Sequence, residues 1–418
     1  MMYLRRIIML STSSINYEKK IFLTTILVRL FFLILVVLLS AYMEKGFIAS
    51  HRDVDDWRYE EGGFYYSQNA TSLIDSNTFT EAYGRINDNT GYNLYRPFYS
   101  TPLWYWVVCI IMYMTKTYWT VRILNIIIAG MSSVVIYNFT KKTYGEKVAR
   151  LTSKLFALLP YPVLFSLFSY KDHLVLLFTF YLLDVSISLK YTRKIKLKTV
   201  LISIFAILGM MLTRSGLSVI LLGLCFSIVF IKDISLKGIF NIKMLFFLII
   251  GLVLISIFYQ DIIYKFNAYS SINLDTKEAN NTISLVLITN IKDLYKLPLI
   301  YMFSIITPIG IGNFDNSWFS VVSNINFIMI PIAVGSLLYI FTKKKRDKIV
   351  FYSLLGYYLI TIIMSTGIFR HYYSLLPITF IPFADYIYRT NRVEKLMWVI
   401  SSILGTILIF YYYFLISN

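Results

Sequence analysis

Residues 22–43 read FLTTILVRLFFLILVVLLSAYM, and Arg29 is the only charged residue among them. A helix of about 20 mostly apolar residues crosses the hydrocarbon core of a bilayer, so this stretch is predicted to do so. It lacks the short core and small-residue cleavage site of a signal peptide, and we expect it to be retained as the first helix. The whole chain is similar in character, since 57% of its 418 residues are hydrophobic and only 15% are charged. Soluble domains carry about a quarter charged residues, so the sequence predicts a membrane protein.

The net charge of +18 is carried by short basic clusters between the apolar stretches. Basic residues placed in this way mark cytoplasmic loops, so we expect no binding to nucleic acid. The two cysteines, Cys109 and Cys225, both lie in apolar stretches and predict neither a disulfide framework nor a zinc site. The clusters lie at 5–20, 141–154, 190–198, 232–243, 343–348 and 389–395.

Eleven crossings place all six clusters on one side of the membrane. That side then holds 25 Lys and Arg against 5 Asp and Glu, while the other side holds 14 against 15. We therefore expect an all-α polytopic bundle over residues 1–418, with a cytoplasmic N-terminus and an outer C-terminus. Residues 45–118 and 261–317 form its longest outer segments, and 97–115 and 299–312 are short helices that do not cross. The crossings are predicted near 22–43, 119–140, 150–169, 173–189, 199–213, 217–231, 244–260, 318–341, 349–367, 372–388 and 396–416.

The first outer segment begins with an acidic stretch, HRDVDDWRYEEGGFYY at 51–66. Charged groups next to a bilayer are costly unless they bind or react with something, so we expect a functional site here. The carboxylates are those of Asp53, Asp55, Asp56, Glu60 and Glu61.

Ionisable residues also occupy three short outer hairpins, at Lys171-Asp172, at Arg214 and at Arg370-His371. Together with the acidic stretch they predict an outward-facing pocket with carboxylates on one side and cations on the others. Structural interpretations stay open, because an arginine at a helix end can bind ordinary lipid phosphate and Asp172 can cap a helix.

Carboxylates and cations beside a membrane suit group transfer from a lipid-phosphate donor. A carboxylate can remove a proton from an acceptor hydroxyl as a general base. Arginine or lysine can neutralise the departing phosphate, where negative charge develops.

Four motifs extend this interpretation. They are the acidic stretch followed by FYY at 64–66, YRPFYSTPLW at 95–104, TYG at 143–145 followed by SYKD at 169–172, and Arg370 followed by Pro377. On these motifs the chain resembles the GT-C superfamily of membrane glycosyltransferases, which includes bacterial oligosaccharyltransferases, protein O-mannosyltransferases and aminoarabinose transferases. The resemblance implies transfer of a sugar from a polyprenyl-phosphate-type lipid to a glycan or lipid acceptor on the outer face of a cell membrane, which we expect to be bacterial.

The resemblance also implies roles for single residues. Asp53 or Asp56, ahead of Asp55 and Glu61, would be the general base, and Asp172 would be the acid of the second outer loop. The donor phosphate would be bound by Arg214, Arg370, Lys171 and His371.

The chain departs from the family at two places. Lys171-Asp172 stands where members carry paired acids, so a divalent metal has little support and no cofactor is predicted. The absence of a large outer C-terminal domain favours a glycan or lipid acceptor over a protein. Two other functions stay open, an O-antigen or polysaccharide polymerase and a lipid-linked glycan flippase or transporter, although a flippase should show internal repeats and polar residues in mid-membrane.

Overall fold

The computed structural model describes residues 2–42, 55–86, 102–192, 196–231, 295, 297–306, 325–341, 345, 347–365 and 374–417. All regular structure in these ranges is helical, which confirms the predicted fold class at the level of an all-α protein. The N-terminal part contains α1 (Met2–Tyr42), α2 (Asp55–Asn69), α3 (Ser76–Ile86), α5 (Leu103–Thr115), α6 (Trp119–Tyr144), α7 (Glu146–Leu158), α8 (Pro160–Phe165), α9 (Asp172–Thr192) and α10 (Leu197–Phe230). The C-terminal part contains α15 (Leu297–Ile306), the 3₁₀ helix η3 (Asn326–Met329), α17 (Ile330–Phe341), α18 (Lys348–Ser365), α20 (Pro377–Arg389) and α21 (Arg392–Ser417).

Four helical segments are long and apolar enough to cross a membrane. They are Asn16–Leu38, Trp119–Tyr144, Asp172–Thr192 and Leu197–Arg214. Each matches a crossing predicted from the sequence. The predicted total of eleven stays a prediction, because the expected crossing at 244–260 and most of the outer segment 261–317 lie outside the described residues.

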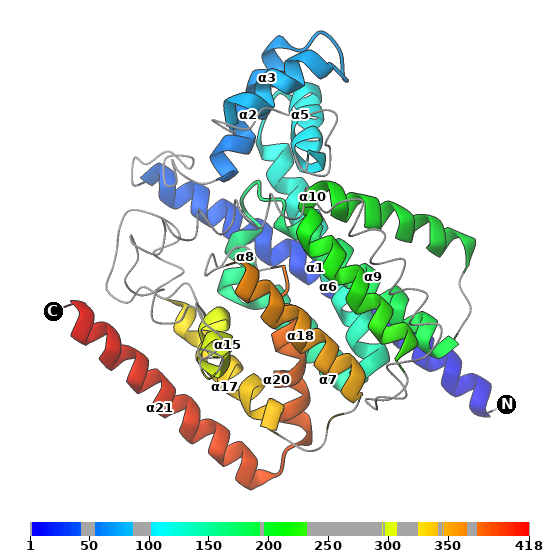
Figure 1. Ribbon diagram of the computed structural model, residues 1–418, viewed down its shortest axis with the longest axis vertical. Helices are drawn as coiled ribbons and strands as arrows, with labels where there is room; N and C mark the ends of the chain where they lie inside the picture. Colours follow the sequence, from blue (N-terminus) through cyan, green and yellow to red (C-terminus); the bar gives the residue numbers. More distant parts are fainter. Residues whose placement is uncertain are drawn as a thin grey trace.

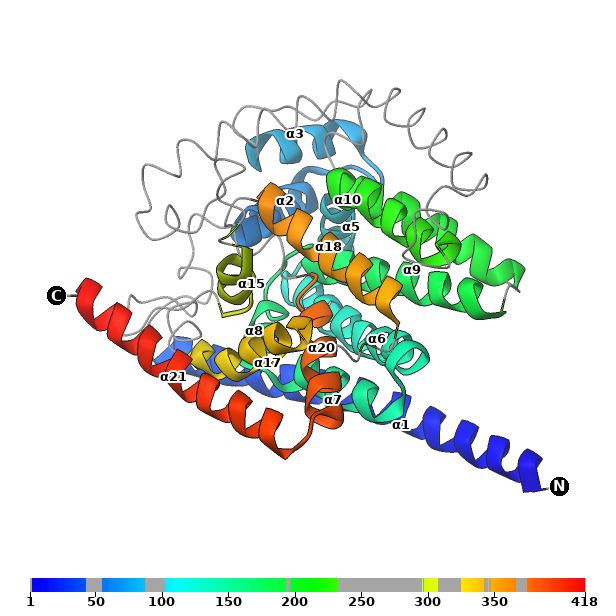
Figure 2. The same cartoon turned by 60° about the horizontal axis from the view of Figure 1, so that its bottom comes forward.

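The surface of the bundle supports a lipid environment. Helix α1 exposes Leu23, Leu27, Phe31, Ile34 and Leu38 along one side. A soluble monomer rarely exposes so continuous an apolar stripe. Figure 2 shows α1 and α21 along one outer edge of the other helices, and Figures 1 and 2 show the two chain ends far apart.

Helices α2, α3 and α5 form a separate layer, which we call the cap, next to α6 and α10 (Figure 1). Its core is aromatic, and the rings of Phe79 and Trp106 stack with centroids 3.8 Å apart. Gly63 lets α2 approach α5, because a Cβ there would lie 2.5 Å from the sulfur of Met112. The cap includes the short helix that we predicted within 97–115.

One predicted crossing is not a continuous helix. The segment 150–169 is divided into α7, which ends at Leu158, and the six-residue α8, which begins at Pro160. Proline has no N–H, so Pro160 leaves the carbonyl of Phe156 without its helical donor. The predicted crossing at 150–169 is therefore not one continuous helix, and the break lies at a proline, which cannot donate the helical hydrogen bond.

Arg29 stabilises this break from inside the bundle. Its Nη2 donates to the carbonyl oxygens of Phe156 and Pro162 at 3.1 and 3.3 Å, and its Nη1 donates to that of Ala157 at 3.1 Å. The side chain is fully buried. A cation near the last carbonyls of a helix is favourable, and a charge inside the membrane needs such partners. The structure thus identifies backbone carbonyls as partners of this charge within the first apolar stretch.

Candidate functional site

The residues proposed from the sequence fall into three groups. Asp53, Arg370 and His371 lie outside the described residues. Asp55 and Asp56 are the first two residues of α2, and Glu61 is exposed on the same helix. Lys171 directly precedes α9, and Asp172 and Arg214 form an ion pair.

Among the described residues next to the cap, the most buried ion pair joins Glu60 of α2 to Arg122 of α6. The side chains are 4% and 1% exposed, and the contacts are 2.8 Å from Nε to Oε1 and 2.9 Å from Nη2 to Oε2. Two parallel bonds of this kind are the strongest arrangement of arginine and carboxylate. Removal of either partner would leave a buried charge and cost about 3–5 kcal/mol, by analogy with soluble proteins.

Sequence reasoning included Glu60 in the acidic stretch but did not assign it a role, and it overlooked Arg122. The signal was present, because Arg122 follows Trp119 by three residues inside a predicted crossing. An arginine inside an apolar helix is expected to have a specific partner. The identity of that partner depends on packing between segments about 60 residues apart, which the pattern of one sequence does not contain.

The segment 166–171, between α8 and α9, is held from three sides. The hydroxyl of Ser169 donates to Oε1 of Glu60 at 2.6 Å, and the indole of Trp104 in α5 donates to the carbonyl of Ser169 at 2.7 Å. From α6, Asn125 donates to the carbonyls of Phe168 and Tyr170 at 2.6 and 2.8 Å. Since an irregular backbone needs partners for its polar groups in a membrane protein, these bonds explain how the segment can be buried.

The next residues lead directly to the second ion pair. Asp172 is in the first turn of α9 and is buried, and its Oδ1 lies 3.2 Å from Nη1 of Arg214. Arg214 lies where α10 departs from helical geometry, with φ −158° and ψ 75°. The side chain of Arg214 retains 12% exposure. The short hairpin predicted at Arg214 therefore coincides with an observed break in α10.

A capped turn closes the far end of α2. Asp75 accepts hydrogen bonds from the backbone N–H groups of Thr71, Asn77 and Thr78, at 3.1 to 3.2 Å. The backbone N–H groups of Thr78 and Thr71, together with the hydroxyls of the same residues, lower the pKa of Asp75 to about 2. The hydroxyl of Tyr66 accepts the N–H of Asp75 at 2.8 Å, which ties the turn to α2.

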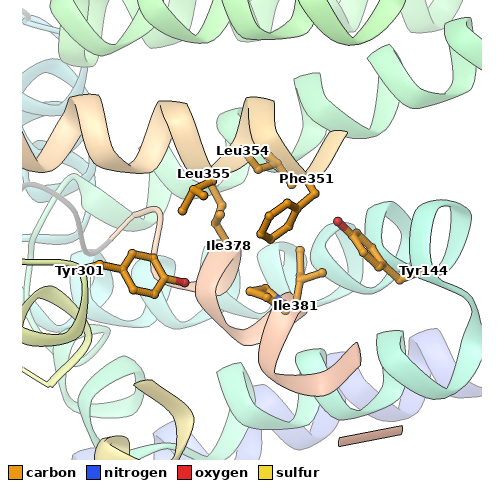
Figure 3. Close-up of a pocket in the computed structure, with 8 residues that line it drawn as sticks. Tyr144, Tyr301, Phe351, Leu354, Leu355, Ile378 and Ile381 are labelled. Atoms are coloured by element: carbon orange, nitrogen blue, oxygen red, sulfur yellow. The ribbon is translucent and has the colours of Figure 1, made fainter. Parts of the chain in front are cut away.

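A small pocket lies elsewhere in the bundle (Figure 3). Tyr144 and Tyr301 face it from opposite sides, while Phe351 and Leu355 of α18 and Ile381 of α20 line it between them. Tyr144 and Arg122 stand at opposite ends of α6, about 33 Å apart at a rise of roughly 1.5 Å per residue. The pocket is therefore not part of the charged site.

The described residues contain no group of three or more His, Cys, Asp or Glu side chains arranged to hold a metal ion. Protein-family models, curated proteins and solved structures gave no match to this chain.

Proposed function

We propose that this protein is a membrane glycosyltransferase. It transfers a sugar from a polyprenyl-phosphate-type lipid to a glycan or lipid acceptor, at the face of the bundle that carries the cap. We take this to be the outer face of a cell membrane, as the basic clusters predict.

The main support for the proposal is that the segment 166–171 connects α2, through Glu60, to the Asp172–Arg214 ion pair. Glu60 connects the segment to α2, which begins at Asp55 and Asp56, and Asp172 connects it to Arg214 at the break of α10. Transfer from a lipid phosphate requires a cation near the membrane boundary and a base for the acceptor hydroxyl. Arg214 and the start of α2 supply residues of both types.

Glu60 is not the base in this proposal, because Arg122 and Ser169 donate to its oxygens. The remaining acids of the stretch are Asp53, Asp55, Asp56 and Glu61. Position 56 precedes Glu60 by four residues in α2, which is about one helical turn. This register supports Asp56, with Asp53 as the other candidate from the sequence.

The surface of α10 supports delivery of the donor from within the bilayer. Leu201, Phe205 and Leu208 are exposed along the half of α10 that ends at Arg214. A polyprenyl chain lying against these residues would bring its phosphate to the guanidinium. Lys171, Arg370 and His371 are the further phosphate ligands in this proposal.

The test separates donor binding from chemistry. In purified protein with a polyprenyl-phosphate sugar, Arg214→Gln should raise the KM for the donor about tenfold or more, since a charged hydrogen bond contributes about 1.5–3 kcal/mol. Asp56→Asn or Asp53→Asn should instead lower kcat by about a hundredfold or more. Arg150→Gln, which removes an exposed arginine of an i,i+4 pair, is the matched control and should change neither constant.

Full transfer by the Asp53→Asn/Asp56→Asn double variant would contradict the assignment of the base. A donor KM in Arg214→Gln equal to that of the control would contradict the assignment of the phosphate ligand. Movement of the lipid-linked sugar across the vesicle membrane without transfer of the sugar to an acceptor would show that the protein is a flippase instead.

A further inference from the structure

Glu60, Arg122 and Ser169, which we call the clamp, join three elements at one buried point. Glu60 belongs to α2, Arg122 to α6 and Ser169 to the segment 166–171. The carboxylate receives donors at 2.8, 2.9 and 2.6 Å. The guanidinium of Arg122 is further enclosed by aromatic rings, with its central carbon 5.2 Å from the ring centroid of Tyr118 and 5.8 Å from that of Phe168.

The clamp sits between the two sets of residues that the proposed reaction needs. The acids Asp55 and Asp56 precede Glu60 by about one turn of α2, and Asp172 follows Ser169 by three residues. An ion pair with two parallel bonds fixes orientation as well as distance. A change at the clamp therefore changes the placement of α2 relative to the Asp172–Arg214 pair.

We infer that the clamp is a positioning device, in which Glu60 and Arg122 fix the first turn of α2 against the segment 166–171. It keeps the acids at the start of α2 at a constant separation from Arg214 and does not itself exchange protons with substrate. This inference rests on the proposed function for its catalytic consequence, while the structural coupling can be measured without any substrate.

Cys109 provides a sensor for this coupling. It is a buried free thiol of α5, in the same apolar core as Tyr59, the residue directly before Glu60. The ring of Tyr59 lies 4.5 Å from that of Tyr105, one turn before Cys109. Burial raises the pKa of the Cys109 thiol, so the closed cap should react slowly with a maleimide.

The first experiment measures maleimide labelling of Cys109 in a Cys225→Ser background in lipid nanodiscs. Glu60→Gln should accelerate labelling by about tenfold or more, because the cap opens locally when its buried contact is weakened. Ser169→Ala removes one bond without leaving a buried charge and should give a smaller acceleration. It also serves as the second variant if Glu60→Gln folds poorly. Glu81→Gln is the matched control, since Glu81 is an exposed cap carboxylate that accepts a bond from Tyr65 at 2.7 Å.

The second experiment compares kinetic constants in the same variants. A displacement of about 1 Å in a reacting group can cost about a hundredfold in rate. We therefore expect Glu60→Gln to lower kcat by about this factor while the donor KM stays within about twofold of the wild-type value. Arg122→Lys keeps the charge but loses the paired bonds. Its kcat should lie between that of Glu60→Gln and that of the wild-type protein.

Labelling of Cys109 at the Glu81→Gln rate in both Glu60→Gln and Ser169→Ala would overturn the clamp, whatever the activity. Faster labelling with an unchanged kcat would overturn its positioning role. If the wild-type protein transfers no sugar, the proposed function fails and the positioning role fails with it, while the labelling rates still decide whether the clamp holds the cap.

Discussion

At the scale of single residues, the arrangement of the site depends on how its buried charges are paired, and the acidic stretch alone does not explain it. The sequence places five carboxylates together, and the structure shows that one of them, Glu60, is surrounded by donors from Arg122 and Ser169. A single sequence predicts that charges beside a membrane need partners, but it does not indicate which partner folds onto which carboxylate. Asp172 and Arg214 were both candidates, yet their contact became evident only from the packing of α9 against α10.

Arg29 allows a stability prediction at the same scale. Arg29→Met should lower the free energy of unfolding by about 3 kcal/mol, because the carbonyls at the break between α7 and α8 lose charged donors. Thermal unfolding in nanodiscs measures the effect. Arg150→Met is the matched control, and its exposed pair with Glu146 should contribute less than about 1 kcal/mol. Equal shifts in the two variants would contradict the role assigned to Arg29.

At the scale of elements, the helices end where their sequences supply partners for the free backbone groups. Helix α3 begins after Asp75, whose carboxylate accepts the N–H groups of Asn77 and Thr78. Aspartate is among the preferred residues at this position. Helix α7 ends before Pro160, and α10 breaks at Arg214. The hairpin at Arg214 was predicted from its ionisable residue, whereas the break at Pro160 was missed because the surrounding residues are uniformly apolar.

The turn at Asp75 should respond to pH. The pKa of Asp75 is lowered from 3.8 to about 2 in the folded protein. The stabilisation of the turn by the ionised carboxylate is therefore fully present above pH 3.8 and is lost as the pH falls through about 2. Amide hydrogen exchange at Thr71, Asn77 and Thr78, corrected for intrinsic rates, should show decreasing protection over this interval. In Asp75→Ala the protection should already be low at neutral pH and should not change between pH 4 and 2. A pH-dependent loss of equal size in that variant would show that another group is responsible.

At the scale of the whole molecule, ion pairs gather at the two ends of the helices. Asp172–Arg214 and Glu60–Arg122 lie at one end of α9 and α6, while Lys190–Asp347 and Lys142–Asp184 lie at or near the other end. Asp172 and Lys190 are separated along α9 by about 27 Å at a rise of roughly 1.5 Å per residue. This is close to the ~30 Å thickness of a hydrocarbon core. The arrangement agrees with the membrane prediction made from hydropathy.

The predicted orientation can be tested by labelling from one side of the membrane. In a Cys109→Ala/Cys225→Ser background, Lys116→Cys should react with an impermeant maleimide added outside intact cells, because the cap is predicted to face outward. Lys147→Cys, at an exposed position of α7, should react only after the membrane is opened. The reverse pattern would invert the topology and place the proposed site in the cytoplasm.

The central claim is that this bundle transfers a sugar from a lipid phosphate, using an acid near the start of α2. The most direct measurement is the transfer of a radiolabelled sugar from a polyprenyl-phosphate donor to envelope glycan or lipid by purified protein in nanodiscs. We predict labelled product with the wild-type protein and a reduction of about a hundredfold or more with Asp53→Asn/Asp56→Asn. No product from folded wild-type protein across a panel of such donors, or equal product from the double variant, would contradict the claim.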